Sequence, residues 1–357
     1  MARIKEILAT VQVYILILVA LLAASTWALN WVSSPISNDN TPVMVTIPKG
    51  ASGAEIARRL KDAGLIRSRL AFIYTVRTRR AGEMLKPGEY ELRRSMSLLE
   101  IIEKLERGEV AAASITIPEG YTVRQIAHLL GEKGIVNEKE FLYIALHGAG
   151  RFKSIVAVPS PSLEGYIFPE TYQFPRKLSP DFVIREMLAV FNKKVAEQFR
   201  QEIQDYNPPQ AGTLTLSGGE FKYNLHEIIT MASIVEREAR TDEDRPLIAS
   251  VINNRLRKGI RLQIDATVQY AMGEHRPRLF FRDYKTPSPY NTYLCLGLPP
   301  GPIANPGIKS IEAVLYPATT DYLYYVANGD GSHVFTRTLE EHAQAVSETR
   351  TGRQNSQ

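Results

Sequence analysis

Three carboxylates lie along one stretch of the chain, residues 225–239, that is predicted to form a helix. This stretch contains neither Pro nor Gly, and its apolar residues recur at three- and four-residue steps, the spacing of a buried helical stripe. At about 100° per residue, Glu236 falls within that stripe, whereas Glu227 and Glu238 fall together on the opposite side. We therefore expect Glu236 alone to point toward the core or toward a cleft that the core lines.

A carboxylate in such a position must be paired, protonated or functional, because burial of a bare charge is expensive. A structural interpretation pairs Glu236 with a core arginine such as Arg255. A functional interpretation makes Glu236 a general acid whose pKa is raised by apolar surroundings, as in glycosidases. The helix alone leaves both interpretations open.

A second group of polar residues lies in a proline-rich segment that cannot form a long helix. Four prolines fall between residues 159 and 175, and residues 161–172 contain two acids and three aromatic residues. Sugar rings pack on aromatic faces, and carboxylates accept hydrogen bonds from hydroxyl groups. Glu164 and Glu170 are therefore candidates for one wall of a glycan groove, and the alternative is an aromatic-rich structural loop.

The helix and this segment belong to a larger α+β domain, which we expect over residues 114–350. A second helix follows the first, with Pro246 in its first turn. Residues 297–307 contain so many Pro and Gly that they predict a rigid, shaped loop. Residues 322–326 and 333–335 are typical of two strands joined by a turn.

The amino terminus contains an uncharged stretch, residues 7–38, whose apolar part over residues 11–32 is long enough to span a bilayer as a helix. Trp31 lies at its far end, where interfacial aromatic residues belong. We expect a retained transmembrane helix over residues 7–32; the alternative is a signal peptide cleaved near Ala24. The basic residues that precede it predict a short cytoplasmic tail and a single-pass anchor in the inner membrane, with the rest of the chain on the periplasmic side.

Residues 47–66 and 117–136 form a self-similar pair, each typical of a strand, a Pro-x-Gly turn, a helix and a Gly stop. Between them, Ser97 and Glu100 form a capping-box pattern at the start of another helix. We therefore expect a small strand–helix–helix–strand unit over residues 41–112. In an exported, anchored protein this pattern resembles a LysM-like module, a type that binds glycans containing N-acetylglucosamine; the alternative is a packing subdomain with no ligand of its own.

Composition excludes several classes of function. The 357 residues have a net charge of +5 and an isoelectric point near 9.1, which suits an anionic envelope but is too weak to indicate a nucleic-acid partner. The lone Cys295 excludes an intramolecular disulfide framework and a cysteine-based zinc site. The six histidines are scattered, with no His-Glu-x-x-His pattern, so a metallohydrolase is disfavoured and we expect no cofactor.

Several segments in the same order resemble the MltG/YceG-like family of endolytic murein transglycosylases. Besides the anchor and the LysM-like module, the resemblance lies in residues 164–172, 232–238, 254–256, 262–267, 288–293 and 297–307. One departure is Ala266, where the family pattern usually has Pro after the Asp; this change removes no chemical group.

The resemblance implies cleavage of the β-1,4 bond between N-acetylmuramic acid and N-acetylglucosamine within a peptidoglycan strand. The C6 hydroxyl of the muramic acid attacks its own anomeric carbon and leaves a 1,6-anhydro end. The resemblance assigns catalysis to the first acid of the Ser-Ile-Val-Glu-x-Glu motif, which is Glu236. It also implies a role in cell wall assembly, with termination of nascent strands and with peptidoglycan synthases as partners.

Other polar residues are candidates for contacts with the sugar chain. Glu170 and Glu238 are candidates for supporting roles, and Gln263, Asp265, Tyr290, Asn291 and Tyr293 for direct contacts; each could instead hold a loop in place by hydrogen bonds. The alternative function from another class is a membrane-anchored scaffold that binds peptidoglycan without cleaving it, in which Glu236 would be dispensable.

Overall fold

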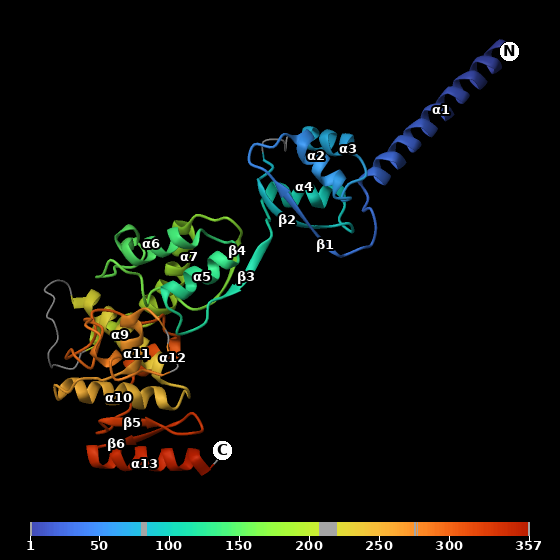
Figure 1. Cartoon of the computed structure of the whole chain (residues 1–357). Helices are drawn as coiled ribbons and strands as arrows, with labels where there is room; N and C mark the ends of the chain where they lie inside the picture. The colour runs from blue at the N-terminus through green and yellow to red at the C-terminus, as the bar shows by residue number, and fades with distance from the viewer. Residues whose placement is uncertain (1, 80–83, 207–219, 275, 277, 356–357) are drawn as a thin grey trace. The chain divides into compact units, whose positions relative to one another are not determined.

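The computed structural model describes residues 2–79, 84–206, 220–274, 276 and 278–355 (Figure 1). The chain divides into two compact units, Met1–Ala112 and Ala113–Gln357. Both contain helices together with short strands, and the described strands pair only two at a time. The predicted mixture of helices and strands is confirmed.

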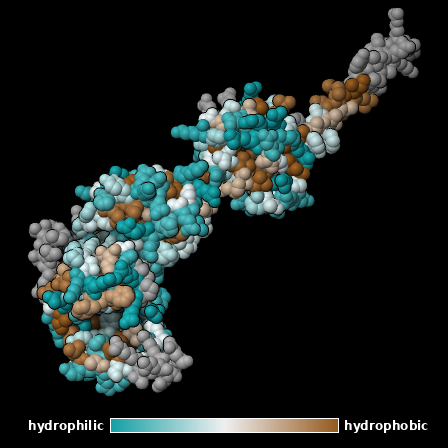
Figure 2. Space-filling view, viewed as in Figure 1, coloured by the Kyte–Doolittle hydropathy of each residue, from teal (hydrophilic) through white to brown (hydrophobic). Residues whose placement is uncertain are grey.

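The first unit begins with a long helix, α1 (Ala2–Ser33). Within the described residues, Ile15–Ser33 is the one segment long and apolar enough to cross a membrane. Its side chains form a mostly apolar surface along the described part of the helix, as Figure 2 shows in brown. This agrees with the expected apolar helix, and by length and composition it is compatible with a membrane anchor.

The rest of the first unit is a small domain in which two strands pair and the helices pack. Its elements are β1 (Pro42–Ile47), α2 (Gly53–Asp62), α3 (Arg69–Thr78), β2 (Gly88–Arg93) and α4 (Leu98–Arg107). The strands are antiparallel, with Pro42 opposite Arg93 and Ile47 opposite Gly88. The order strand–helix–helix–strand is present, but its second helix is α3, which was not predicted, and the helix predicted after Ser97 is α4, which follows the second strand. The predicted capping box is also present, because the backbone N–H of Ser97 donates to Glu100 at 2.7 Å and Glu100 N–H donates to the Ser97 hydroxyl at 3.3 Å.

The second unit is mostly helical and holds two further strand pairs, β3 with β4 and β5 with β6. Its first elements are β3 (Ala112–Thr116), α5 (Val123–Glu132), α6 (Glu138–His147), the 3-10 helix η1 (Ala149–Phe152), β4 (Thr171–Pro175), α7 (Pro180–Phe191), the π-helix η2 (Asn192–Glu197) and α8 (Arg200–Asp205). Its later elements are α9 (Glu220–Glu238), α10 (Asp244–Arg257), α11 (Asp265–Met272), the 3-10 helix η3 (Asp283–Lys285), α12 (Ile308–Leu315), β5 (Tyr324–Ala327), β6 (His333–Thr336) and α13 (Leu339–Asn355).

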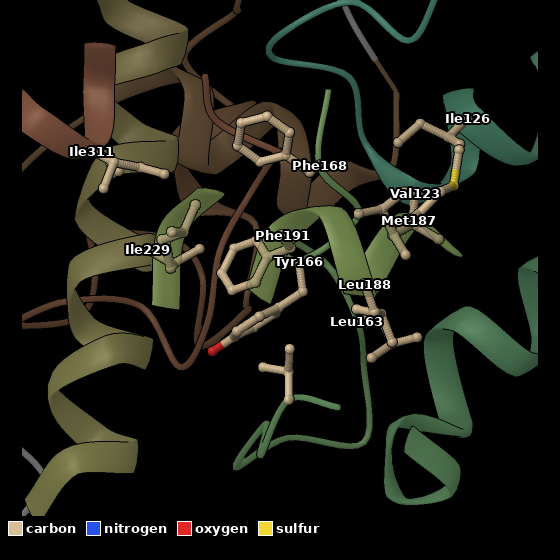
Figure 3. Close-up of a cluster of buried hydrophobic side chains, with 14 of the residues drawn as sticks. Val123, Ile126, Leu163, Tyr166, Phe168, Met187, Leu188, Phe191, Ile229 and Ile311 are labelled. Carbon is tan, nitrogen blue, oxygen red and sulfur yellow. The ribbon is translucent and has the colours of Figure 1, made fainter. Parts of the chain in front are cut away.

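The core of the second unit joins the proline-rich segment to helices α7, α9 and α12. The rings of Tyr166 and Phe191 lie 5.0 Å apart between centroids, close to Ile229 of α9 (Figure 3). Gly165 has φ of +87°, and an added Cβ there would lie 2.5 Å from Pro302, so this crossing of two loops requires glycine. The loop 297–307 is therefore packed against the core, as its Pro and Gly content predicts.

Helix α9 passes through the middle of this unit and is not half exposed. Every residue from 228 to 235 is buried, including the polar Thr230 and Ser233. Those two hydroxyls donate to the backbone carbonyls of His226 and Thr230, which satisfies them inside the core. A helix that is buried on all sides has no solvent face, so its helical phase alone cannot tell which carboxylate points inward.

The carboxyl-terminal part forms a layer on α10. The hairpin of β5 and β6 pairs Tyr324 with Thr336 and Ala327 with His333, which confirms the predicted strands. Figure 1 shows this hairpin between α10 and α13. The layer brings the side chains of β5 to the carboxyl-terminal end of α9, where the last of the three carboxylates lies.

Candidate active site

A cavity of about 420 Å³ opens beside the end of α9. Its wall combines charged and hydrogen-bonding groups with aromatic and aliphatic side chains, which is the usual composition of a small-molecule or glycan site. The lining residues are Glu238, Val251, Ile252, Arg255, Leu262, Gln263, Ile264, Asp265, Tyr293, Tyr324, Tyr325, Leu339 and His342. Segments more than 100 residues apart in the sequence therefore meet at one place.

Glu238 is a half-buried acid that lines this cavity. Removal of its carboxyl group from water, together with the nearby charge of Asp265, raises its pKa from 4.5 to about 7. Hydrogen bonds from the Tyr325 hydroxyl, at 3.1 Å, and from the backbone of Ala266 act in the opposite direction. A carboxyl group with a pKa near neutrality can give up a proton and take one back at physiological pH, which is what acid–base catalysis requires.

Glu238 was expected to point away from any cleft, and that expectation is wrong. The phase argument assumed that α9 has one buried stripe, but every residue from 228 to 235 is buried, so no single stripe marks the inward side. The face that carries Glu238 meets α11, and Glu238 itself accepts a hydrogen bond from Tyr325 of β5, so a second surface covers this side of the helix.

Asp265 is the second acid of the cavity and begins helix α11. Its Oδ1 accepts a hydrogen bond from the Tyr293 hydroxyl at 2.6 Å, and its Oδ2 lies 3.5 Å from the Tyr284 hydroxyl. The two tyrosine rings pack at 4.6 Å between centroids and support each other. The predicted candidates Asp265 and Tyr293 are thus neighbours, and both are positioned to contact a ligand in the cavity.

Gln263 lines the same cavity and has an unusual backbone conformation. Its φ is +53°, in the left-handed region that non-glycine residues rarely adopt. Its backbone N–H donates to the Thr292 carbonyl at 3.2 Å, and the next N–H, of Ile264, donates to the Thr292 hydroxyl at 3.0 Å. These bonds hold the strained residue, and such strain is common where a side chain must be aimed at a ligand.

Arg255 supplies the positive charge of the cavity. Its guanidinium donates to the carbonyls of Leu323 at 2.6 Å and Leu262 at 2.8 Å, and it lies 4.9 Å from the centre of the Tyr324 ring. These partners are neutral, so among the described residues no carboxylate cancels its charge. The suggested pairing of Arg255 with Glu236 is therefore wrong: Arg255 joins β5 to the segment before Gln263.

Glu236 is held in a different place, by an ion pair with Arg245. Its two oxygens lie 3.2 and 3.3 Å from the guanidinium nitrogens of Arg245. Oε2 also accepts from the Ser310 hydroxyl at 2.8 Å and from the backbone N–H of Gly307 at 3.0 Å, at the start of α12. The side chain is 7% exposed, and a helix amino terminus favours an anion, so this carboxylate is fully engaged by protein groups.

The two acids of the proline-rich segment do not line the cavity. Glu164 is 4% exposed and accepts from Val123 N–H at 2.9 Å, from the Asn305 side chain at 3.1 Å and from the Tyr270 hydroxyl at 3.3 Å. Burial raises its pKa to about 7. Glu170 instead forms an ion pair with Lys194, and that contact lowers its pKa. The contacts of Glu164 hold three chain segments together. Glu170 contacts η2, the π-helix that directly follows α7.

Asn291 and Tyr290 also differ from the expected pattern. Asn291 is fully buried, and its side-chain amide donates to the carbonyls of Tyr284 at 3.0 Å and Thr286 at 2.9 Å. It shapes the loop that carries Tyr284. Tyr290 packs against Tyr270, with 4.9 Å between the ring centres, and it does not line the cavity. The structure thus places Glu238, Gln263, Asp265 and Tyr293 together, and it places Glu164, Glu170, Glu236, Tyr290 and Asn291 elsewhere.

Sequence reasoning missed the groups that β5 and α13 bring to the cavity, namely Tyr324, Tyr325, Leu339 and His342. Tyr325 lies 87 residues after Glu238, and no local pattern links the two. The available signal was weak: two adjacent tyrosines in a predicted strand must point to opposite faces, so one of them had to face the helical core.

The sequence matches the YceG-like family over residues 45–348. An endolytic murein transglycosylase of Bacillus subtilis (strain 168) is 37% identical over 330 residues, which cover 87% of this chain and 86% of that protein. An endolytic murein transglycosylase of Streptococcus pneumoniae serotype 2 (strain D39 / NCTC 7466) is 31% identical over 342 residues, which cover 87% of this chain and 59% of that protein.

A solved structure is also similar to this chain. The crystal structure of a yceG-like protein from Listeria monocytogenes aligns with a TM-score of 0.55 and 34% sequence identity. The alignment covers 85% of this chain and 99% of the other. The likeness therefore extends across both compact units rather than to one domain alone.

Proposed function

Because the chain belongs to the YceG-like family, we propose that it is a lytic transglycosylase that cleaves peptidoglycan within its glycan strands. The bond cleaved is the β-1,4 bond between N-acetylmuramic acid and N-acetylglucosamine, and the product carries a 1,6-anhydro end. The observation that carries the proposal is the cavity that combines one half-buried acid of raised pKa with polar and aromatic side chains suited to contact a sugar.

Glu238 is the general acid of this proposal, in place of Glu236. Its pKa of about 7 keeps a useful fraction protonated at neutral pH, and it faces a cavity large enough for a ligand. Glu236 has both oxygens bound to protein donors and lies outside that cavity. A proton donor must reach the leaving oxygen, and of the two glutamates at the end of α9 Glu238 is the one that lines the cavity.

The reaction needs only one group that first donates and then accepts a proton. Protonated Glu238 donates to the oxygen of the leaving N-acetylglucosamine, and the anomeric carbon becomes positively charged. The N-acetyl group of the substrate stabilises that charge. The Glu238 carboxylate then removes the proton from the C6 hydroxyl as that oxygen closes the 1,6-anhydro ring. Gln263, Asp265 and Tyr293 hold the sugar, and Asp265 also helps to keep the Glu238 proton in place.

Asp265 raises a second possibility, because hydrolytic glycosidases use two carboxyl groups. In that case Asp265 would activate water and the product would carry a reducing end. The Tyr293 and Tyr284 hydroxyls occupy its two oxygens, which favours a role in positioning over one in proton removal. The product of the reaction separates the two chemistries.

The proposal extends to location and partners, and the apolar helix α1 supports it. Helix α1 anchors the chain in the inner membrane, with both folded units on the periplasmic side, next to nascent glycan strands and the synthases that make them. Cleavage there would end strand elongation. The small domain of β1, β2 and helices α2–α4 would bind the same polymer as a LysM-like module.

The test is mass spectrometry of purified peptidoglycan digested by the full-length protein in detergent. We expect fragments with 1,6-anhydro ends from within strands, and none from the Glu238→Gln protein. Reducing N-acetylmuramic acid ends would establish hydrolysis instead. If the wild-type protein binds peptidoglycan without releasing fragments, the protein is a scaffold and not an enzyme.

A further inference from the structure

A second cavity, of about 410 Å³, lies between α8, α10 and the end of α12, and the proposed reaction does not use it. Helix α10 separates it from the first cavity. Val251 and Arg255 line the first cavity, whereas Asn253 and Arg257 line the second. At about 100° per residue these two pairs point about 160° apart, so the cavities occupy opposite faces of one helix.

Two groups on α10 have unused hydrogen-bonding capacity in this second cavity. Asn253 is 6% exposed, and its side-chain oxygen has no hydrogen-bond partner within the described structure. A buried amide oxygen without a partner is destabilising, so such groups usually meet a ligand or water. Arg257, one turn further along, forms no ion pair among the described residues, and its guanidinium can bind a carboxylate through two parallel hydrogen bonds.

The facing wall carries the opposite charge. Glu202 and Asp205 project from α8, and each uses one oxygen within the protein: Glu202 accepts from the Tyr316 hydroxyl at 2.8 Å, and Asp205 accepts from Gln201 at 2.8 Å. Between the two charged sides lie Leu315 and the ring of Tyr316. The cavity thus offers a cation, carboxylates, an amide and an apolar floor.

We propose that this cavity binds the peptide stem of peptidoglycan, as a short peptide that carries both a carboxylate and an amine. The carboxylate pairs with Arg257, the amine with Asp205 or Glu202, and an amide of the peptide with Asn253. A neutral glycan would leave the Arg257 charge unmatched, so a peptide fits better. The inference rests on the proposed function, because it takes the stem from the polymer that the first cavity cleaves.

The binding test uses the full-length protein in detergent and the synthetic peptide L-alanyl-γ-D-glutamyl-L-lysyl-D-alanine, followed by calorimetry. We expect the wild type to bind, and Arg257→Glu to weaken binding at least about tenfold, since a lost charge-assisted hydrogen bond is worth about 1.5–3 kcal/mol. Asn253→Leu, of similar size, should weaken it several-fold. The matched control is Lys258→Glu, which makes the same charge change at an exposed neighbour outside both cavities.

A kinetic test separates this site from the catalytic one. On glycan that carries its peptides, Arg257→Glu should raise KM and leave kcat unchanged. On glycan stripped of its peptides, the same substitution should change neither KM nor kcat. Equal peptide binding by wild type and Arg257→Glu, no binding at all, or binding only of an N-acetylglucosamine oligosaccharide would each overturn the proposal. Failure of the wild type to cleave either glycan would overturn the proposed function, and the calorimetry would still report on the second cavity.

Discussion

The last turn of α9 carries two glutamates whose surroundings could hardly differ more. Glu236 faces the start of α12, where Arg245, Ser310 and the backbone of Gly307 bind both of its oxygens. Glu238, two residues later, faces the cavity bounded by α10, α11 and β5, where Tyr325 is its one side-chain hydrogen-bond partner among the described residues. Two identical side chains on one helical turn therefore have different surroundings: Glu236 pairs with a cation, and Glu238 faces a cavity.

The contrast shows how neighbours decide what a buried carboxyl group can do. A cation and a helix amino terminus stabilise negative charge, so Glu236 links α9, α10 and α12 through its ion pair with Arg245 and its bonds to Ser310 and Gly307. Apolar and aromatic neighbours, together with Asp265, disfavour a second negative charge, so Glu238 retains a proton near neutral pH. The first arrangement supports the fold, and the second supports proton transfer.

The largest expected effect separates the two glutamates by activity. Glu238→Gln keeps the size of the side chain but removes the proton, so the rate of cleavage should fall by about 10²–10⁴-fold, the usual contribution of a general acid. Glu236→Gln should leave the rate per folded molecule within about tenfold of wild type. Both rates are measured as release of soluble fragments from peptidoglycan.

The opposite result would reverse the assignment. If Glu236→Gln loses activity and Glu238→Gln keeps it, the acid predicted from helical phase is the catalytic one, and the cavity beside Glu238 has another role. If neither substitution matters, the protein binds peptidoglycan without cleaving it.

The second prediction concerns the contribution of the Glu236–Arg245 ion pair to the free energy of unfolding. Arg245→Met leaves a buried carboxylate without its cation, which typically costs about 3–5 kcal/mol. We expect a corresponding drop in the free energy of unfolding, measured by urea denaturation followed by circular dichroism. The matched control is Arg240→Met, at an exposed position just after α9. A loss of less than 1 kcal/mol would mean that the ion pair does not link the helices.

The sequence predicted the elements better than it predicted which sides of α9 are buried. The helices, the capping box at Ser97 and the β5–β6 hairpin depend on local spacing, and local spacing is visible in the sequence. The environment of Glu238 depends on Tyr325 and on α11, which reach it from distant parts of the chain. A single buried stripe was the wrong assumption for a helix whose entire middle section is buried.

The predicted site residues also fall into two groups, according to whether contacts from distant parts of the chain decide their role. Gln263, Asp265 and Tyr293 lie in polar segments that follow α10, and the structure brings them to the cavity. Asn291 has the same kind of sequence context, yet its amide is used to hold the carbonyls of Tyr284 and Thr286. Residue type and spacing cannot distinguish a side chain that stabilises its own loop by hydrogen bonds from one that points from the loop into a cavity.

The third prediction concerns Glu238 and the pH dependence of the free energy of unfolding. An unfolded glutamate titrates near 4.5 and folded Glu238 near 7, so between these values the unfolded chain loses a proton that the folded protein keeps. Its stabilising contribution is full below pH 4.5 and is lost as pH rises through 7, which amounts to about 3 kcal/mol. Glu164, with a pKa also raised to about 7, acts in the same direction.

We therefore expect the free energy of unfolding to be lower at pH 8 than at pH 5, by urea denaturation of the full chain. Glu238→Gln should reduce that difference and should be more stable than wild type at pH 8. A pH dependence identical to that of wild type would show that Glu238 is not the group that titrates.

The smallest effect tests a single hydrogen-bond donor. The N–H of Ala266 lies in the first turn of α11, where a helix leaves its backbone donors unpaired, and its hydrogen bond to Glu238 lowers the pKa of that acid. Ala266→Pro removes this donor at a position where the first turn tolerates proline. The pKa of Glu238 should then rise slightly, and the alkaline limb of kcat/KM should move upward by less than about one pH unit. Ala266→Ser keeps the N–H and should leave the limb in place. A downward shift for Ala266→Pro would mean that the donor acts on the protonated form of Glu238, and an unchanged profile together with full activity would mean that another group gives the proton.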